Sequence, residues 1–469
     1  MANSNPKSER GVTVVAHSDL SPAHQSMQVL EHLNRSGLLA LPPVALPDLH
    51  LKPTLETPSS VATATRDTLI LGLTSPSPNC GMALVATALD EDDLNEDRLD
   101  DLFHRLAAAL NPDDRSPAIE DATLDDILLH GATAVTQFTI HDGSCAFSPD
   151  ETSTNHAAIL SSVPADLRSM ARREFGLVGR GNHFLELQVI DQLLDEPTAI
   201  AWGLFSGQVV IMYHADSGHL GAIVGRLFAH RRKNTLKGRL IEWRVKLAYH
   251  LLMADGASLG ARWRRLRYFL PRRWLPIQVD SDEGRRCRWA LGAAANYAFA
   301  SRLAVLETLN RALNKVWSVA DAPRLLYDAP HNGIWREWIG EQNLWVHRHN
   351  AVRVTPPSCL PADSPYRDTG HPVLLPGTER TSSYLCASGE GAAHSLHSAS
   401  HGAGHAVQAL SRALDEQFLS TRVYRYGDCL VELWPHLSDD GVDAVLQALV
   451  AHDIARPVVR LRPVAVLKG

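Results

Sequence analysis

The sequence predicts an α+β fold, built as one large domain in which helices and strands are mixed. Segments with strand and helix periodicity follow one another without a regular strand–helix–strand alternation. The 469 residues contain no internal repeat and no clear linker. We therefore expect a disordered tail over residues 1–12 and a single domain over residues 13–469.

The first predicted elements are strands that lead to a cysteine. Residues 44–50 have the pattern of a short buried strand that runs into a loop. Residues 68–73 predict a second strand, and the Pro- and Ser-rich loop over residues 74–79 then presents Cys80. The strand pattern resumes over residues 82–88.

The next segments predict a helix, a loop and two further strands. An amphipathic helix is expected over residues 91–110, because apolar residues recur there at helical spacing: Leu99, Leu102, Phe103, Leu106 and Leu110. Residues 142–156 are polar and predict a loop. Residues 199–213 alternate apolar residues with Gly, which predicts two strands, the second of which delivers His214.

The C-terminal part predicts two helices, a loop and a final strand. Residues 289–316 form a long helix with small residues on one face. Residues 388–404 are rich in Gly, Ser and His and predict a loop. A last helix is expected over residues 442–450, followed by a strand that ends at Lys468.

Charge is distributed unevenly along the chain. The net charge is −7, yet residues 226–288 carry 17 Lys or Arg against 5 Asp or Glu, so this segment is strongly basic. Aromatic residues are interleaved with it: Trp243, Trp263, Tyr268, Phe269, Trp274 and Trp289. This basic helical segment indicates an anionic partner such as a phosphate backbone with stacked bases. The alternative is a solvated helical face whose aromatic residues belong to the core.

Composition excludes several classes of protein. No stretch of 18 apolar residues occurs, and residues 1–10 lack the apolar region of a secretion signal. Six cysteines are scattered without the spacing of a disulfide framework. We expect a cytoplasmic protein with reduced thiols and no membrane contact.

Four residues at predicted strand or loop ends have the character of metal ligands: Cys80, His183, His214 and His331. A thiolate with imidazoles suits zinc, manganese, iron or cobalt, and a thiolate can bridge two ions. The four residues come from distant parts of the chain, so no short spacing defines a site. The alternative for each is ordinary: a buried Cys in the core, and a His in a satisfied polar contact.

One histidine lies between small residues. His401 is followed by Gly402, Ala403 and Gly404, so no bulky neighbour blocks its approach to a phosphorus atom, as a nucleophile requires. A second interpretation takes His394, His397, His401 and His405 as a metal-binding face of one helix. The intervening Ser and Gly residues form helices poorly, which favours a loop with one functional histidine.

Eight segments, in chain order, resemble the RtcB-type RNA ligases. They are LPDLH (46–50), CGM (80–82), GLVGRGNHFLE (176–186), YH (213–214), ANYAFA (295–300), YDAPHN (327–332), VHR (346–348), and PVLLPG (372–377) leading to HGAG (401–404). The terminal RLRPVAVLKG (460–469) also resembles the end of that family. The resemblance implies a ligase that uses GTP and one or two Mn²⁺ ions. It would join RNA 2′,3′-cyclic-phosphate or 3′-phosphate ends to 5′-hydroxyl ends.

The resemblance also implies roles for individual residues. His401 would attack the α-phosphorus of GTP to form a histidine–GMP intermediate, with Asn182 orienting the phosphates. The implied metal ligands are Cys80, His183, His214 and His331. The implied GTP-binding residues are Asn182, Phe184, Glu186, Thr378, Ser383, His401, Gly402, Ala403, Gly404 and Lys468. The implied RNA-binding residues are Arg348 and Arg353.

The sequence departs from the family pattern at several positions. Ser77 stands where the family has an aspartate ligand, and a hydroxyl is a weaker ligand for a divalent ion. Asp216, Ser217 and Gly218 replace a Gly-Ser-Arg run, and His405 and His349 replace an arginine and a lysine. Fewer fixed cations therefore remain to hold phosphates.

Three functions stay open at this point. The first is a divergent RNA ligase, a monomer with RNA ends as its substrate and an archease-type activator as a candidate partner. The second is a relative with metal-dependent phosphoesterase or nucleotidyl-transfer activity. The third binds RNA ends without ligation.

Overall fold

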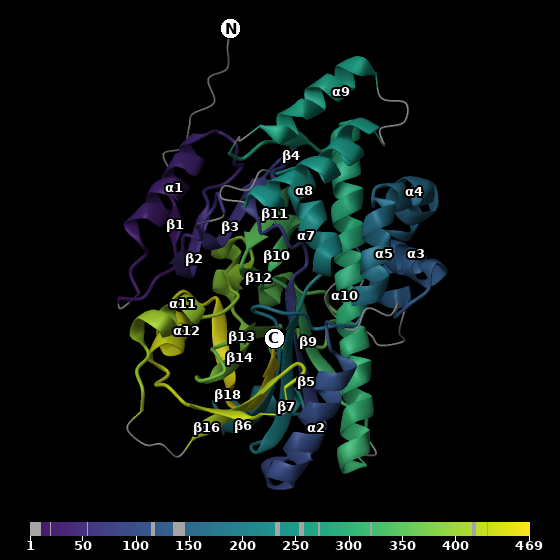
Figure 1. Ribbon diagram of the computed structural model, residues 1–469. Helices are drawn as coiled ribbons and strands as arrows, with labels where there is room; N and C mark the ends of the chain where they lie inside the picture. The colour runs from purple at the N-terminus through teal and green to yellow at the C-terminus, as the bar shows by residue number, and fades with distance from the viewer. Residues whose placement is uncertain are drawn as a thin grey trace.

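Two β-sheets and the helices that cover them form the structure, which confirms the predicted α+β class (Figure 1). The computed structural model describes residues 11–18, 20–53, 55–113, 118–134, 146–229, 235–252, 258–270, 273–318, 321–414, 419–428 and 430–469. Most of the predicted tail, residues 1–10, lies outside this range. Gly11 and Val12 lead into the first strand, β1 (Thr13–Val14).

A nine-stranded sheet forms the centre of the described structure, in the order β13-β14-β18-β6-β7-β5-β9, with β16 and β17 attached beside β18. Its neighbouring strands are antiparallel, except that β16 runs parallel to β18. The strands are β5 (Gly81–Asp90), β6 (Phe184–Leu193), β7 (Gln208–Ala215), β9 (Arg324–Pro330), β13 (Pro372–Leu375), β14 (Ser383–Ser388), β16 (Ser420–Arg425), β17 (Glu432–Pro435) and β18 (Ala455–Lys468).

A second sheet has five strands in the order β1-β2-β3-β11-β10. Besides β1 it contains β2 (Val44–His50), β3 (Ser59–Thr65), β10 (Asn332–Ile339) and β11 (Gln342–His349). Two short pairs complete the described strands: β12 (Ala351–Arg353) with β15 (Ser398–Ser400), and β4 (Thr68–Leu69) with β8 (Ile277–Gln278).

The helices gather mainly around one long helix, α10, which runs along the side of the large sheet (Figure 1). They are α1 (His24–Arg35), α2 (Glu96–Ala109), α3 (Asp121–His130), α4 (Pro149–Ser161), α5 (Ala165–Glu174), α6 (Glu196–Ala201), α7 (Gly218–Leu227), α8 (Leu236–Leu247), α9 (Leu259–Arg265), α10 (Asp282–Trp317), α11 (Gly404–Leu410) and α12 (Asp440–Ala451). None of the described helices is both long enough and apolar enough to cross a bilayer.

Strand β7 shows how the sequence pattern produces the central sheet. Val209, Ile211 and Tyr213 point into a core that also contains residues of α2 and α10. Val210 and Met212, which alternate with them, are buried in the core on the opposite face. Each fully buried side chain of this size stabilises the fold by roughly 1.5–3 kcal/mol. Burial on both faces explains why this strand is a continuous apolar run.

Helix α10 confirms the predicted long helix and its small-residue face. The Ser281 hydroxyl accepts the N–H of Gly284 at 3.0 Å, which caps the first turn. A Cβ atom at Gly292 would lie 2.4 Å from the Phe147 ring, so only glycine permits this contact. The small residues therefore let α10 approach the neighbouring segments closely.

A buried ion pair joins α10 to the central sheet. Arg302 Nε donates to Asp328 Oδ1 in β9 at 2.6 Å, and both side chains are almost fully buried. Arg302 Nη1 also donates to the carbonyl of Asn79 at 2.8 Å. Since Asn79 precedes Cys80, this guanidinium fixes the loop that presents the cysteine.

Several predicted elements differ from the structure. Residues 68–73 form only the two-residue strand β4 and a 3₁₀ turn, Leu71–Leu73. The predicted loop over residues 142–156 is wrong from residue 149 onward, where α4 begins; residues 142–145 lie outside the described range. The Ser148 hydroxyl accepts the N–H of Glu151 at 3.2 Å, and Pro149 occupies the first turn of α4. Both residues are typical of a helix start, but the polar composition of the segment led to the prediction of a loop.

Two further predictions need correction. The first of the two strands expected over residues 199–213 is wrong, because α6 ends there; Asp195 caps this helix through the N–H of Thr198. The loop expected over residues 388–404 contains a 3₁₀ turn, Glu390–Ser395, and the short strand β15. The described parts of the basic segment 226–288 are largely helical, as predicted, and include α8 and α9.

We predict that Asp328→Asn lowers the free energy of unfolding by about 3–5 kcal/mol, because the buried Arg302 loses its counter-charge. The matched control is Asp101→Asn, which removes an exposed pair with Arg105 and should cost less than about 1 kcal/mol. Thermal and denaturant unfolding of the three proteins would measure both changes. Equal stability of the two variants would contradict a structural role for the buried pair.

Candidate active site

The antiparallel order β6-β7-β5-β9 brings the predicted metal ligands to one edge of the large sheet. Cys80 precedes β5 and His183 precedes β6, whereas His214 lies near the end of β7 and His331 directly follows β9. In antiparallel neighbours the start of one strand lies beside the end of the next. Met82 and Phe184 both pair with His214, which fixes this arrangement.

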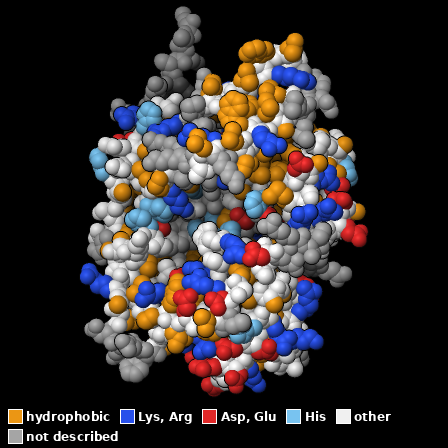
Figure 2. Space-filling view, viewed as in Figure 1, with side chains coloured by type: hydrophobic (Ala, Val, Ile, Leu, Met, Phe, Trp, Pro, Cys, Tyr) orange, Lys and Arg blue, Asp and Glu red, His pale blue; other side chains and the backbone are white. Residues whose placement is uncertain are grey.

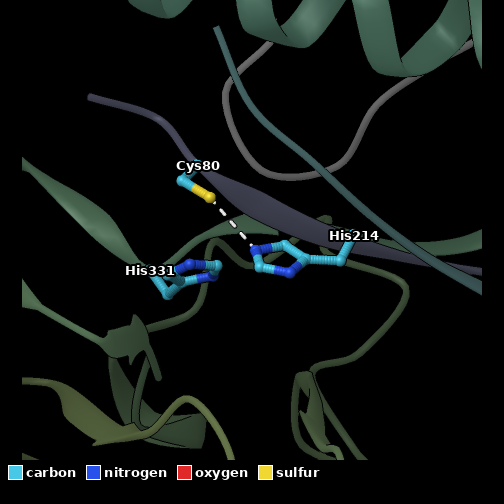
Figure 3. A group of neighbouring side chains, drawn as sticks. All are labelled: Cys80, His214 and His331. Carbon is cyan, nitrogen blue, oxygen red and sulfur yellow. Dashed lines mark hydrogen bonds between the residues drawn. The ribbon is translucent and has the colours of Figure 1, made fainter. Parts of the chain in front are cut away.

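Cys80, His214 and His331 form a first group of possible ligands. Their side chains point toward one another (Figure 3), and the sulfur and ring nitrogen atoms lie within 4.8 Å of each other. Cys80 Sγ is 3.0 Å from His214 Nε2. His214 Nδ1 donates to the carbonyl of Asn182 at 2.9 Å. That bond leaves the Nε2 lone pair facing the thiol, as a metal ligand requires.

Cys80 belongs also to a second group, with His183 and Asp216, whose ligand atoms again lie within 4.8 Å of one another. His183 Nε2 is 3.6 Å from Cys80 Sγ and 3.7 Å from Asp216 Oδ2. The structure thus brings all four predicted ligands together and adds a carboxylate that sequence reasoning did not assign as a ligand. The sequence had marked Asp216 only as one of three residues, with His219 and Arg348, that could compensate for the departures from the family pattern.

Burial decides the protonation of this cluster. Burial and the neighbouring His183 hold the pKa of His214 well below its usual range, and burial with His401 does the same for His331. Burial, with the Asp216 charge, raises the pKa of the Cys80 thiol. His331 Nδ1 is buried and has no hydrogen-bond partner among the described residues. Neutral imidazoles and an unsatisfied nitrogen fit a metal ion, whose binding would displace the thiol proton.

His401 lies against this cluster. Its ring stacks on that of His331, with centroids 3.5 Å apart and planes at 19°, and its centroid is 5.5 Å from that of His214. Burial and the nearby Lys52 cation lower the pKa of His401 to about 3. The imidazole is therefore neutral near pH 7 and has a free lone pair, which a nucleophile needs.

The residues on either side of the His401 turn are anchored to the 46–50 segment. Ser400 donates to the carbonyl of Pro47 at 2.6 Å, and the Asp48 carboxylate accepts the N–H of Ala406 at 2.7 Å. Burial raises the pKa of Asp48 to about 7, against the effect of its backbone hydrogen bonds. These contacts hold the 46–50 segment against the turn that contains His401.

The small residues of this turn have different surroundings. Ala403 is buried and donates its N–H to the carbonyl of Pro376 at 3.1 Å. A Cβ at Gly402 would meet the Pro376 carbonyl at an ordinary 3.4 Å, and one at Gly404 would have no neighbour within 4 Å. Contacts with the rest of the protein therefore do not demand these two glycines.

The predicted nucleotide-binding residues Glu186 and Ser383 meet inside the large sheet. Gln188 Nε2 donates to Glu186 at 2.5 Å and to the Ser383 hydroxyl at 3.2 Å. Ser383 also accepts the N–H of Gly377 at 3.0 Å. Burial and the neighbouring Glu379 raise the pKa of Glu186 to about 8. A buried carboxyl group with a pKa near neutral pH is suited to hydrogen bonding with the polar edge of a nucleotide base.

The other predicted nucleotide residues lie around this pair and the cluster. Lys468 Nζ is 3.2 Å from Glu379, and the Thr378 hydroxyl is 3.2 Å from that of Thr381 in the same turn. Phe184 is half-buried with its ring 5.9 Å from His214. Asn182 is exposed beside the cluster, so its side chain is free to meet a ligand.

The two predicted RNA-binding arginines have different environments. Arg348 is buried, donates to Glu337 at 2.8 Å, and also donates to the Ser398 hydroxyl and the His397 carbonyl. Its guanidinium is engaged inside the protein, which argues against the predicted RNA contact. The side chain of Arg353 is 42% exposed and lies 3.7 Å from Glu337.

The histidines near His401 do not form one helical face. His394 belongs to a 3₁₀ turn, His397 has a left-handed backbone at φ 50°, and His405 lies in α11. The ring of His405 stacks on that of His50 at 4.9 Å. The alternative of a four-histidine metal face is therefore wrong.

The basic segment exposes a mixed surface. Figure 2 shows apolar side chains concentrated over α8 and α9, with Lys and Arg beside them. Trp243 is 57% and Trp263 73% exposed, whereas Tyr268 and Trp274 are buried. Some aromatic residues of the segment thus belong to the core and two tryptophans are exposed, and the anionic partner stays a prediction.

Curated proteins with similar sequences carry the name tRNA-splicing ligase RtcB. That of Pyrococcus furiosus is 29% identical over 83% of this chain and 40% of its own length. Those of Aeropyrum pernix and Archaeoglobus fulgidus are 28% identical over 83% of this chain and 80% of their own length. The chain thus spans less than half of the Pyrococcus relative.

A family model described as tRNA-splicing ligase RtcB matches residues 40–469. This range includes every segment that suggested the resemblance, as well as the cysteine–histidine cluster and His401. The chain belongs to the RtcB tRNA-splicing ligase family.

Proposed function

We propose that this protein is an RNA ligase that joins 2′,3′-cyclic-phosphate or 3′-phosphate ends to 5′-hydroxyl ends. The observation that carries the proposal is the stacking of His401 on His331, within a cluster of one thiol and three imidazoles. A neutral, half-buried histidine beside a group of possible metal ligands suits nucleotidyl transfer. The names of the relatives support RNA as the substrate.

Cys80, His183, His214 and His331 would hold one or two Mn²⁺ ions. Bound metal would offset negative charge on the phosphates that react there. The protein's own contribution is to hold the imidazoles of His214 and His331 neutral and to fix the His214 tautomer through the carbonyl of Asn182. Lys52 places a further cation near Cys80 and His401.

In the first step His401 attacks the α-phosphorus of GTP. A nitrogen–phosphorus bond forms, the bond from that phosphorus to the bridging oxygen breaks, and pyrophosphate leaves. Asn182 and the Gly402–Ala403–Gly404 turn would orient the phosphates. Glu186, Ser383, Thr378 and Lys468 would bind the rest of the nucleotide, with Phe184 near the base.

A 2′,3′-cyclic-phosphate end would first be opened by water to a 3′-phosphate. In the second step an oxygen of the RNA 3′-phosphate would attack the phosphorus of the histidine-bound GMP, forming a phosphorus–oxygen bond as the bond from that phosphorus to His401 breaks. The 5′-hydroxyl of the other RNA end then displaces GMP and forms the new phosphodiester. Arg353 and the exposed tryptophans of α8 and α9 are candidates for RNA contact. We propose a cytoplasmic monomer, with an archease-type protein as a candidate activator.

We predict that wild-type protein incubated with Mn²⁺ and α-³²P-GTP retains label through denaturing electrophoresis, and that His401→Ala retains none. The reason is that alanine offers no lone pair for the phosphorus. His394→Ala removes an exposed histidine from the same region and should label like wild type. Equal labelling of His401→Ala would place the nucleophile elsewhere, and RNA binding without labelling would favour the end-binding alternative.

We predict that Cys80→Ser and His331→Ala each bind Mn²⁺ at least about 10-fold more weakly than wild type, because each loses a ligand. Titration of metal-free protein, with free Mn²⁺ followed by electron paramagnetic resonance, would measure this. His130→Ala, an exposed histidine on α3, serves as the matched control. Unchanged affinity in both cluster variants would refute this metal site.

A further inference from the structure

The contacts of the Asp216 side chain point to a role that its place in the sequence does not indicate. It lies in the short connection between β7 and α7, two residues after His214. One carboxylate oxygen, Oδ1, accepts the N–H of Gly218 at 2.7 Å. The other, Oδ2, accepts the hydroxyl of Ser77 at 2.6 Å and lies 3.7 Å from His183 Nε2. Both oxygens are thus oriented, and Oδ2 faces the cluster.

The surroundings of His183 hold its ring toward the Cys80 sulfur and the Asp216 carboxylate. A Cβ at Gly179 would lie 2.9 Å from His183 Nδ1, so this glycine, at φ +98°, lets the backbone pass close to the ring. The opposite nitrogen, Nε2, faces both the Cys80 sulfur and the Asp216 carboxylate. A thiol, an imidazole and a carboxylate thereby converge from three separate segments.

The two groups of possible ligands share the Cys80 sulfur. Without a carboxylate, the cluster would offer only sulfur and nitrogen atoms, whereas Mn²⁺ prefers oxygen donors. Asp216 supplies that oxygen on the His183 side, away from His331. The side chains of Asp216 and His183 are 18% and 11% exposed, so water screens them only partly.

We propose that Asp216 is a metal ligand, acting with Cys80 and His183, and that Ser77 is the residue that positions it. Ser77 stands where the resemblance led us to expect a carboxylate; the structure places the carboxylate of Asp216 against its hydroxyl. The carboxylate is therefore supplied by a residue 139 positions further along the chain, in hydrogen-bond contact with Ser77. This inference rests on the metal site of the proposed function.

Metal binding to the purified, metal-free chain tests the assignment without relying on ligation. Asp216→Asn keeps the size of the side chain and removes its charge, and should weaken Mn²⁺ binding at this position by at least about 10- to 100-fold. Ser77→Ala removes only the orienting hydroxyl and should weaken it by about 10-fold. Asp97→Asn, an exposed carboxylate on α2, should bind Mn²⁺ like wild type.

A reciprocal exchange keeps the test decisive if a single variant is unstable. Asp216→Ser alone should lose affinity, and Ser77→Asp combined with Asp216→Ser should recover it, because the hydrogen-bonded pair then again contains one carboxylate and one hydroxyl. Thermal unfolding of each metal-free variant would separate folding defects from lost ligands.

The outcomes distinguish the inference from the proposed function. Wild-type affinity in Asp216→Asn, with affinity still lost in Cys80→Ser, would overturn the role of Asp216 and leave the metal site in place. An exchange variant that recovers no binding would also count against it. Absence of Mn²⁺ binding in the wild-type chain would overturn the metal site and this inference together.

Discussion

The buried ion pair between Arg302 and Asp328 is the contact on which the rest of the site depends. It ties the long helix α10 to the β9 strand, and the same guanidinium binds the carbonyl of Asn79 beside Cys80. Gly81 completes this arrangement, since a Cβ there would lie 2.7 Å from the carbonyl of Ala329. An ion pair in this position costs desolvation free energy, and its hydrogen bonds to the loop are what make the geometry unique.

The second constraint is the antiparallel register of four central strands. Because β5 and β6 begin where β7 and β9 end, residues distant in sequence meet at one edge of the sheet. Burial then makes the imidazoles of His214 and His331 neutral, and the same desolvation acts on His401. The fold thus sets both the positions and the protonation of these side chains, which are the two properties that the proposed metal site and nucleophile require.

The cations lost from the family pattern have only partial replacements. The ring of His405 stacks on that of His50. Arg348 is held by Glu337, so its guanidinium is not free to meet a phosphate. Lys52, which the sequence did not single out, lies close enough to Cys80 and His401 to influence both. The balance of charge at this site therefore differs from what the motifs alone indicated.

The sequence by itself determined the α+β class, the long helix α10, the final strand and the set of ligand types, because periodicity and motifs are local properties of the chain. It missed α4 and α6, whose capping residues Ser148 and Asp195 lie in polar or Gly-containing stretches. Only the tertiary structure decided which side chains meet: it placed Arg348 inside the protein and brought Asp216 to Ser77 and His183. Strand register and burial, which are properties of the whole fold, decide such contacts, and no local pattern encodes them.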